Sequence, residues 1–245
     1  MNLYVEPNYD KMSRRAAEII IQQMKKKPNS LVCMAAGNTP LGTFNHLVKA
    51  VENGEVTVDA CHFISLDEWV GLDGTDEGSC RQTLDAHFFK PCGIDEQHIH
   101  FFDAKGADLQ AECDKMDAFI QSHGHIDVLL LGVGMNGHLG FNEPGVSFDT
   151  HTHVIELDAV TKQVSAKYFT EQREVQQGIT LGIKHMLEAE TVILIADGLK
   201  KAEIIEKALH GEVTNEVPVS VLQQHPNVYL CLDADAASLL KRRRG

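Results

Sequence analysis

The sequence predicts one α/β domain, built on a mostly parallel β-sheet with helices on both faces. Short apolar segments rich in β-branched residues alternate with amphipathic segments along the whole chain. No internal repeat, low-complexity tract or Pro/Ser-rich linker interrupts this alternation. A chain of 245 residues is long enough to bury a large core as one unit. We therefore expect residues 1–245 to form a single domain.

The predicted elements follow from hydrophobic spacing and from turn residues. The helix at residues 10–26 carries Ala16, Ile19 and Met24 on one face, and Pro40 and Gly54 bracket the next helix. The expected strands are 3–5, 31–36, 61–66, 99–102, 126–133, 152–157, 178–183, 191–196 and 228–232. The expected helices are 10–26, 40–53, 79–89, 107–122, 160–169, 198–209, 218–224 and 234–243.

Composition limits the classes of partner. The formal net charge of −13 argues against nucleic acid or an anionic membrane as the main partner, but it is compatible with a small anionic substrate held by local Lys and Arg side chains. No apolar run reaches the roughly 18 residues of a membrane span. The first ten residues lack the basic and apolar regions of a signal peptide. Six scattered cysteines without a C-x-x-C pair predict reduced thiols in a cytoplasmic protein.

Polar residues follow three of the predicted strands, where a parallel sheet places its ligands. Gly37, Asn38 and Thr39 join a strand to a helix, so their backbone N–H groups and the Thr39 hydroxyl suit a phosphate. The same residues also fit a plain turn with Thr39 as the helix N-cap. Asp67 directly follows the strand at 61–66 and suits a general base, although a cap or turn role fits it equally.

The third strand end is a glycine-rich segment that carries Asn136, His138 and Glu143. Its G-x-G-x-x-G spacing resembles a dinucleotide fingerprint, but Pro144 leaves too few residues for the helix that this fingerprint requires. Histidine is the usual proton shuttle at neutral pH, and Asn136 or Glu143 could fix its tautomer. A structural loop histidine is the competing interpretation. The coincidence of three polar strand ends favours an enzyme.

The remaining histidines form three pairs with i, i+2 spacing, which are His98/His100, His123/His125 and His151/His153. No pair is followed by a third ligand at a spacing typical of zinc sites. We therefore expect no metal and no organic cofactor.

Three motifs together resemble the glucosamine-6-phosphate deaminase/isomerase family, in the same order and over nearly the whole chain. These motifs are Gly37-Asn38-Thr39-Pro40-Leu41-Gly42, Leu66-Asp67-Glu68-Trp69-Val70-Gly71-Leu72 and the segment GVGMNGHLGFNEP from Gly132 to Pro144. Trp69, the turn at 78–80 and the segment 177–182 are closer to the galactosamine-6-phosphate deaminase/isomerase branch. The resemblance implies a Rossmann-like fold.

The resemblance also implies a reaction, in which an amino-hexose 6-phosphate and water give a ketohexose 6-phosphate and ammonium. Asp67 would move a proton from C2 to C1. His138 would open the sugar ring with help from Glu143 and Asn136. The phosphate ligands would be Gly37, Asn38 and Thr39 together with Lys201, while Lys167 stands where the family often has a phosphate-binding Arg.

Other interpretations remain open. A 6-phosphogluconolactonase-type hydrolase shares this fold, and a non-enzymatic sugar-phosphate sensor is a third candidate. The sequence does not decide between a monomer and a homo-oligomer, or between gluco and galacto substrates. Well-known members of the family are activated by N-acetylglucosamine 6-phosphate, but residues 145–160 show no matching basic cluster. We therefore expect no such activation.

Overall fold

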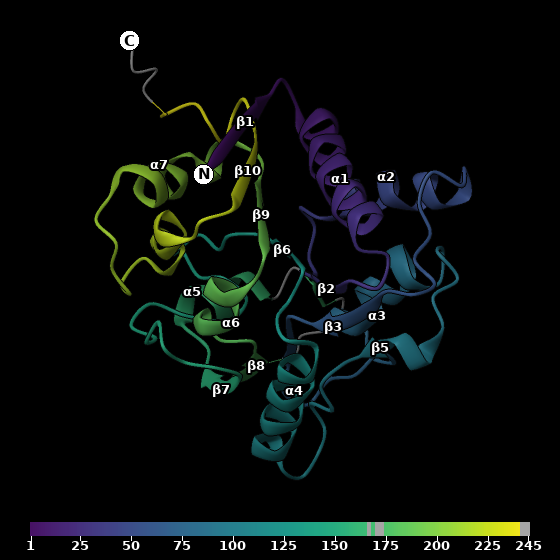
Figure 1. Ribbon diagram of the computed structural model, residues 1–245. Helices are drawn as coiled ribbons and strands as arrows, with labels where there is room; N and C mark the ends of the chain where they lie inside the picture. Colours follow the sequence, from purple (N-terminus) through teal and green to yellow (C-terminus); the bar gives the residue numbers. More distant parts are fainter. Residues whose placement is uncertain (166–167, 170–173, 241–245) are drawn as a thin grey trace.

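A seven-stranded, fully parallel β-sheet forms the centre of the protein (Figure 1), in a computed structural model that describes residues 1–165, 168–169 and 174–240. Each strand pairs in parallel with its neighbours. In spatial order the strands are β1 (Asn2–Glu6), β10 (Val228–Asp233), β9 (Thr191–Ala196), β6 (Val128–Leu131), β2 (Leu31–Met34), β3 (His62–Ser65) and β5 (Ile99–His100). This confirms the predicted mostly parallel sheet.

The central strands are apolar throughout because both faces of the sheet are covered. Leu31 and Cys33 of β2 enter one hydrophobic core, whereas Val32 and Met34 enter the core on the opposite face. The alternation of side chains along a strand explains this division. Both layers of helices predicted from the sequence are therefore present.

Seven α-helices lie among the described residues, and two groups of them cover the two faces of the sheet (Figure 1). Side chains of α1 and α2 fill one core, and side chains of α4, α6 and α7 fill the other. The helices are α1 (Tyr9–Lys26), α2 (Leu41–Glu52), α3 (Cys80–Leu84), α4 (Leu109–His123), α5 (Ala159–Ser165), α6 (Ile183–Glu188) and α7 (Ala202–His210). A π-helical turn η1 (Asp85–Phe89) continues α3, and 3₁₀ segments are η2 (Glu96–His98), η4 (Leu199–Lys201) and η5 (Pro218–Gln224). No helix in the described parts of the chain is long and apolar enough to cross a membrane.

A second, antiparallel sheet of three strands stands beside the main one, and the sequence did not predict it. Its order is β4 (Asp67–Trp69), β8 (Gln177–Thr180) and β7 (His153–Glu156). The expectation that Asp67 sits in a cap or turn is wrong, because it begins β4 and pairs with Thr180. Trp69 anchors this sheet, with its ring centroid 4.5 Å from that of Phe141.

The predicted helix at 234–243 is wrong over residues 234–240, which form consecutive turns. The carboxylate of Asp233 accepts hydrogen bonds from the backbone N–H of Ala236 at 2.8 Å and of Gly198 at 3.0 Å. The first turn is thereby tied to the loop after β9. Leu239 is 47% exposed, so the segment lacks the continuous buried stripe that would stabilise a helix.

The direction of the chain across the sheet reverses between β2 and β6. From β2 the chain proceeds outward through β3 to β5, whereas from β6 it proceeds through β9 to β10 on the other side. In open α/β sheets the ligand binds at the carboxyl ends of the strands beside such a reversal. The fold therefore places a site where Gly37–Thr39 and the segment after Leu131 leave the sheet.

Candidate active site

His138 is held by the tight loop that follows β6. Gly137 has a φ of +90°, a conformation that favours glycine at this position. The imidazole lies directly against Gly134, where an added Cβ would come within 2.4 Å of the ring. The backbone N–H of His138 donates to Oδ1 of Asn136 at 3.2 Å. Loop geometry therefore fixes both the backbone and the ring face of His138.

Glu143 is the acidic partner of His138. Its Oε2 lies 3.3 Å from Nδ1 of His138 and accepts a 2.9 Å hydrogen bond from Nδ2 of Asn136. Asn136 therefore supports the imidazole through Glu143 and through the backbone, and it makes no bond to the ring itself. The expectation that Asn136 could fix the tautomer directly is wrong, and this role falls to Glu143.

The environment of Glu143 keeps its carboxylate ionised. Burial would raise its pKa, but the hydrogen bond and charge of His138, with smaller contributions from Thr161 and Asn136, lower the pKa to about 2. The backbone N–H of Asp158 also donates to Oε1 at 3.3 Å. An ionised carboxylate at Nδ1 stabilises a positive imidazole and leaves Nε2 for a ligand.

Thr161 of α5 completes this group, although the sequence did not identify it. Its hydroxyl lies 3.3 Å from Nδ1 of His138. Thr161 is 23 positions from His138, and nothing in its local sequence distinguishes it from other polar residues of the predicted helix at 160–169. Only the packing of α5 over the loop brings the two side chains together.

Asp67 lies at the point where the chain passes from the main sheet to the second sheet. It is 9% exposed, and burial raises its pKa to about 7, against a hydrogen bond from Cys80 that lowers it. The Cys80 thiol lies 3.4 Å from Oδ1. The His138 loop approaches the same carboxylate, because a Cβ at Gly140 would lie 3.4 Å from Oδ2. A carboxylate with a pKa near neutrality can both take up and release a proton.

Glu68 has a structural role beside Asp67. Its buried carboxylate accepts hydrogen bonds from the backbone N–H groups of Trp69, Cys80 and Arg81 and from the Ser79 hydroxyl. These bonds tie the start of α3 to β4 and hold Cys80 against Asp67. Glu68 is therefore fully engaged in hydrogen bonds that hold β4 and α3 together.

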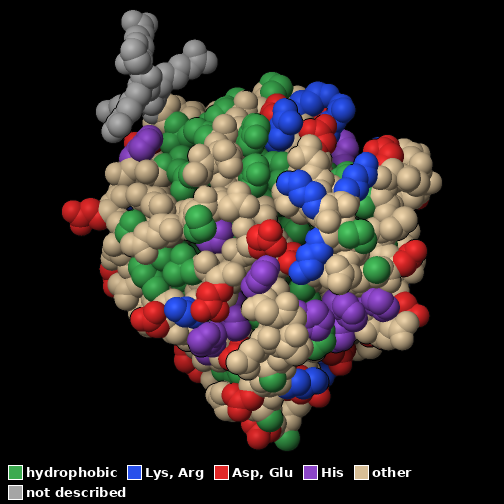
Figure 2. Space-filling model, viewed as in Figure 1, with side chains coloured by type: hydrophobic (Ala, Val, Ile, Leu, Met, Phe, Trp, Pro, Cys, Tyr) green, Lys and Arg blue, Asp and Glu red, His purple; other side chains and the backbone are tan. Residues whose placement is uncertain are grey.

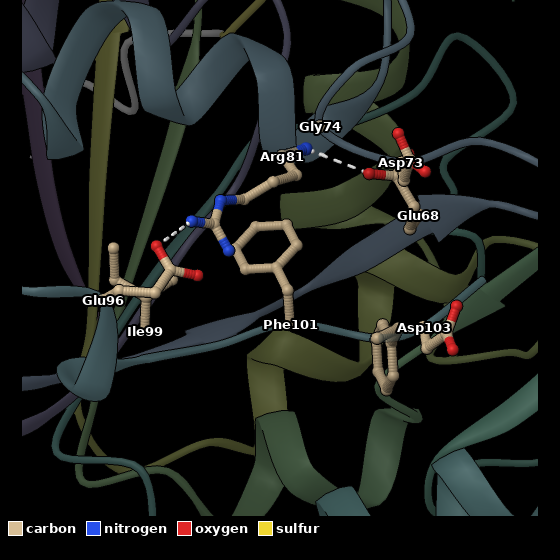
Figure 3. Close-up of a pocket in the computed structure, with 9 residues that line it drawn as sticks. Glu68, Asp73, Gly74, Arg81, Glu96, Ile99, Phe101 and Asp103 are labelled. Atoms are coloured by element: carbon tan, nitrogen blue, oxygen red, sulfur yellow. Dashed lines mark hydrogen bonds and ion pairs between the residues drawn. The ribbon is translucent and has the colours of Figure 1, made fainter. Parts of the chain in front are cut away.

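The pocket behind Glu68 is separate from this chemistry. It has a volume of about 260 Å³, and Figure 3 shows Arg81 extending across it toward Glu96 beside Phe101. The guanidinium of Arg81 is already paired with Glu96 and with Asp85, the latter at 2.7 Å. Since neither His138 nor Asp67 lines this pocket, we assign the active site to the strand ends and not to this cavity.

The turn after β2 presents unpaired backbone donors. Gly37 has a φ of +111°, and the N–H groups of Gly37, Asn38 and Thr39 donate to none of the described residues. The Thr39 hydroxyl donates to Oδ1 of Asp197 at 2.7 Å, so Thr39 does not cap α2, and that alternative is wrong. Asp197 itself was missed, because it follows β9 and is 158 positions from Thr39.

Lys201, the lysine predicted to bind the phosphate beside this turn, lies in η4, which follows β9. Nζ of Lys201 lies 2.6 Å from the carbonyl oxygen of Val133, immediately after β6. Lys201 therefore reaches the same strand end as His138. Tyr168 borders the turn at Gly37, since a Cβ at Gly37 would lie 3.4 Å from the Tyr168 hydroxyl. Lys167, the other predicted phosphate ligand, lies outside the described residues.

The described part of the chain holds two groups of three side chains that could together ligate a metal, and neither includes Asp67, His138 or Glu143. All six cysteines are free thiols. The candidate active site consists of a histidine–glutamate pair and a buried carboxylate of raised pKa. It lies next to a turn whose N–H groups donate to none of the described residues.

Comparison with known proteins identifies the family of this chain. Residues 7–230 match the family of glucosamine-6-phosphate isomerases/6-phosphogluconolactonase. A glucosamine-6-phosphate deaminase of Thermoanaerobacter pseudethanolicus is 37% identical over 241 residues, which cover 98% of this chain and 95% of that protein. A solved structure of a monomeric glucosamine-6-phosphate deaminase is 33% identical, with a TM-score of 0.94, and the match covers 98% of this chain and 100% of that one.

A more distant structure gives the fold alone. The 6-phosphogluconolactonase of Trypanosoma brucei is 18% identical, with a TM-score of 0.75 over 98% of both chains. The near relatives cover almost the full length, and the three motifs of the candidate site lie within the matched residues. The chain therefore belongs to the glucosamine-6-phosphate isomerase/6-phosphogluconolactonase family.

Proposed function

We propose that this protein is an amino-sugar phosphate deaminase/isomerase that converts glucosamine 6-phosphate and water to fructose 6-phosphate and ammonium. The observation that carries the proposal is the convergence of two acid–base centres on one strand edge. These are His138, which is paired with the ionised carboxylate of Glu143, and Asp67, whose pKa is raised to about 7. The full-length similarity to named glucosamine-6-phosphate deaminases supports the same substrate class.

In the proposed ring opening, His138 takes the proton of the O1 hydroxyl and delivers it to O5, so that the C1–O5 bond breaks. The hydrogen bond of Nδ1 to Glu143 leaves Nε2 to face the sugar. The imidazole is positively charged midway through this transfer, and the Glu143 carboxylate offsets that charge. Asn136 acts as a positioning residue by holding Glu143.

Enolisation of the open-chain sugar is assigned to Asp67. Its carboxylate removes the proton from C2, and the same proton is returned to C1, which gives the imine of the ketose. Water then adds at C2 and ammonium leaves. A base with a pKa near 7 is well matched to a proton transfer in both directions at neutral pH. These steps need no electron transfer and no organic cofactor.

The sugar phosphate is assigned to the turn at Gly37, Asn38 and Thr39 and to Lys201. The backbone N–H groups of the turn, which no described residue accepts, and the lysine supply donors and positive charge at one end of the site. Lys167 is proposed as a further phosphate ligand on its position in the sequence alone. Because a lysine lacks the fork of an arginine, it would bind the phosphate as a single point charge.

Side-by-side assays test this function. We expect the purified protein to release ammonium from glucosamine 6-phosphate, with galactosamine 6-phosphate assayed under the same conditions to settle the C4 configuration. An enzyme active only on galactosamine 6-phosphate would correct the sugar while retaining the reaction. Hydrolysis of 6-phosphogluconolactone without ammonium release from either amino sugar would favour the lactonase function. Binding of these sugar phosphates without turnover would favour the sensor.

A further inference from the structure

A group of metal-ligating side chains lies apart from the active site, where the loop before β7 meets α6. His151, His185 and Glu188 each offer one ligand atom, and these three atoms lie within 4.8 Å of one another. His185 is buried, whereas His151 and Glu188 are exposed. Figure 2 shows histidine, acidic and basic side chains gathered on the surface over α6. An ion could therefore reach these ligands directly from solvent.

His185 is oriented by a second carboxylate. Its Nε2 lies 2.7 Å from Oδ1 of Asp117 on α4, which accepts the ring proton. The proton on Nε2 leaves the lone pair on Nδ1, and Nδ1 makes no hydrogen bond to any described residue. A histidine whose outer ring nitrogen donates to a carboxylate is the usual arrangement of a metal-ligating imidazole. Its tautomer and direction are set before any ion arrives.

The backbone around the three ligands is held equally firmly. Oδ1 of Asp117 also accepts the N–H of Thr152 at 3.2 Å, next to His151. Gly182, immediately before α6, packs so closely that a Cβ there would lie 2.1 Å from the carbonyl oxygen of His151. The N–H of Lys184 donates to the carbonyl oxygen of Thr150 at 3.1 Å. The loop and α6 thus keep His151 and His185 on facing elements.

We propose that His151, His185 and Glu188 form a binding site for a divalent transition metal such as Zn²⁺. Two imidazoles and one carboxylate suit such an ion, with water completing its coordination shell. Ligand atoms around zinc lie about 3.3 Å apart, given bond lengths of about 2.0–2.1 Å. Rotation of the two exposed side chains closes the remaining gap. The bound ion would fasten the loop that follows Glu143 to α6.

A neighbouring lysine lowers the affinity expected of this site. Nζ of Lys184 lies 3.6 Å from Oε1 of Glu188, so this ammonium competes with the ion for the carboxylate. The other candidate group, His125 with Asp127 and Glu190, is less suited, because the buried Asp127 carboxylate already binds Nζ of Lys27 at 2.6 Å. His125 therefore serves as a matched control for a surface histidine beside carboxylates.

Titration of the full-length, chelator-treated protein with Co²⁺ tests the site, because the visible absorption of bound Co²⁺ reports its coordination. We expect one saturable site per chain. His151→Ala and Glu188→Gln should each weaken binding by about tenfold or more, and Asp117→Asn by about 10–100-fold. Lys184→Ala should tighten binding, and His125→Ala should leave it unchanged. Zn²⁺ should displace Co²⁺ and raise the melting temperature of the wild type.

The proposal is overturned if no saturable binding occurs, or if His151→Ala and Glu188→Gln bind Co²⁺ as the wild type does. Loss of binding in His125→Ala alone would assign the ion to the other group and would equally refute it. Both key substitutions are at exposed positions, and circular dichroism checks that each variant is folded. None of these residues belongs to the proposed catalytic set, so the outcome is independent of the deaminase assays.

Discussion

At the scale of single residues, the proposed chemistry depends on two carboxylates with opposite pKa shifts. The bond and charge of His138 outweigh burial at Glu143 and keep it ionised, while burial at Asp67 dominates and raises its pKa to about 7. Glu143 can therefore act as a permanent negative charge, and Asp67 can exchange a proton near neutral pH. The surroundings of each carboxylate therefore determine whether it acts as a permanent charge or as a proton-exchanging group.

Replacement of Glu143 by Gln tests the first of these roles. Gln keeps the size of the side chain but removes the charge that supports the imidazolium. We expect kcat for ring opening of cyclic glucosamine 6-phosphate to fall by about 10²–10⁴-fold. Glu212→Gln, at an exposed position, is the control and should behave as the wild type. Unchanged turnover in Glu143→Gln would exclude an electrostatic role for Glu143.

The pH dependence of kcat/KM tests the second role. Asp67 must be deprotonated to act as a base, so kcat/KM should rise with pH and level off above about 7. The Cys80 thiol lowers the pKa of Asp67 by donating to it, so Cys80→Ala should move this limb to higher pH. The controls are Cys80→Ser, which keeps a donor at Asp67, and Cys92→Ala, which changes a distant thiol. A limb that stays in place in Cys80→Ala would refute the assignment.

The sequence predicted where several polar residues gather, because glycine-rich strand ends and acid–base residues are local features. Asp67, Asn136, His138 and Glu143 all lie at the expected strand edge. Their contacts were less predictable: Thr161 and Asp197 reach the site from segments far along the chain. Hydroxyl and carboxylate side chains are common on loops and helices, so their sequence context does not mark such distant contacts.

At the scale of elements, the loop after β6 brings His138 from a buried strand to the candidate active site. The imidazole of His138 packs on Gly134, and the turn continues through Gly137 at positive φ. By contrast, β4 was missed because a strand of three residues shows no readable periodicity. The helix expected at 234–243 is replaced by turns over residues 234–240, where only Ala236 and Ala237 are buried. Tertiary contacts determine the structure of short elements, whereas hydrophobic periodicity predicts long elements.

Gly134→Ala tests whether the loop positions His138. The added methyl would lie 2.4 Å from the ring, so the imidazole must shift from its present position beside Glu143. We expect a loss of kcat of about 10²-fold, as a displacement of about 1 Å can cause, with the fold retained. Gly132→Ala is the matched control, because a Cβ there meets nothing within 4 Å. Equal activity of the two variants would contradict a positioning role for the loop.

At the scale of the whole molecule, topology places the candidate active site, and we expect this site to cost stability. The reversal of strand order between β2 and β6 gathers Gly37, Lys201 and His138 at one edge. The second sheet brings Asp67 to the same edge, in a buried position that disfavours its ionised form. Removal of that charge should therefore stabilise the folded protein, as is common at functional sites.

Asp67→Asn tests this cost. The folded-state pKa of Asp67 is raised from an ordinary value of 3.8 to about 7, so its ionisation destabilises the fold progressively as pH rises between these values. Above about pH 7 the cost is at most about 4 kcal/mol. Asp67→Asn should melt several degrees above the wild type at pH 8, with the difference shrinking toward pH 4. Asp59→Asn, at an exposed carboxylate, is the control.

A melting-temperature difference between Asp67→Asn and the wild type that stays constant from pH 4 to pH 8 would contradict the raised pKa. A variant less stable than the wild type at pH 8 would contradict it as well. In either case the base assigned to enolisation would have to be sought among other residues.

The central claim is that Asp67 removes the C2 proton of glucosamine 6-phosphate during its deamination. NMR analysis of this proton and of the products tests the claim most directly. Glucosamine 6-phosphate is incubated in D₂O with the wild type or with Asp67→Asn, while the C2-bound proton, fructose 6-phosphate and ammonium are followed. We expect the wild type to consume the C2 proton signal and to form the two products in equal amounts, and Asp67→Asn to leave that proton in place. Conversion by Asp67→Asn at the rate of the wild type would contradict the proposed mechanism. So would a wild-type protein that converts neither glucosamine 6-phosphate nor galactosamine 6-phosphate.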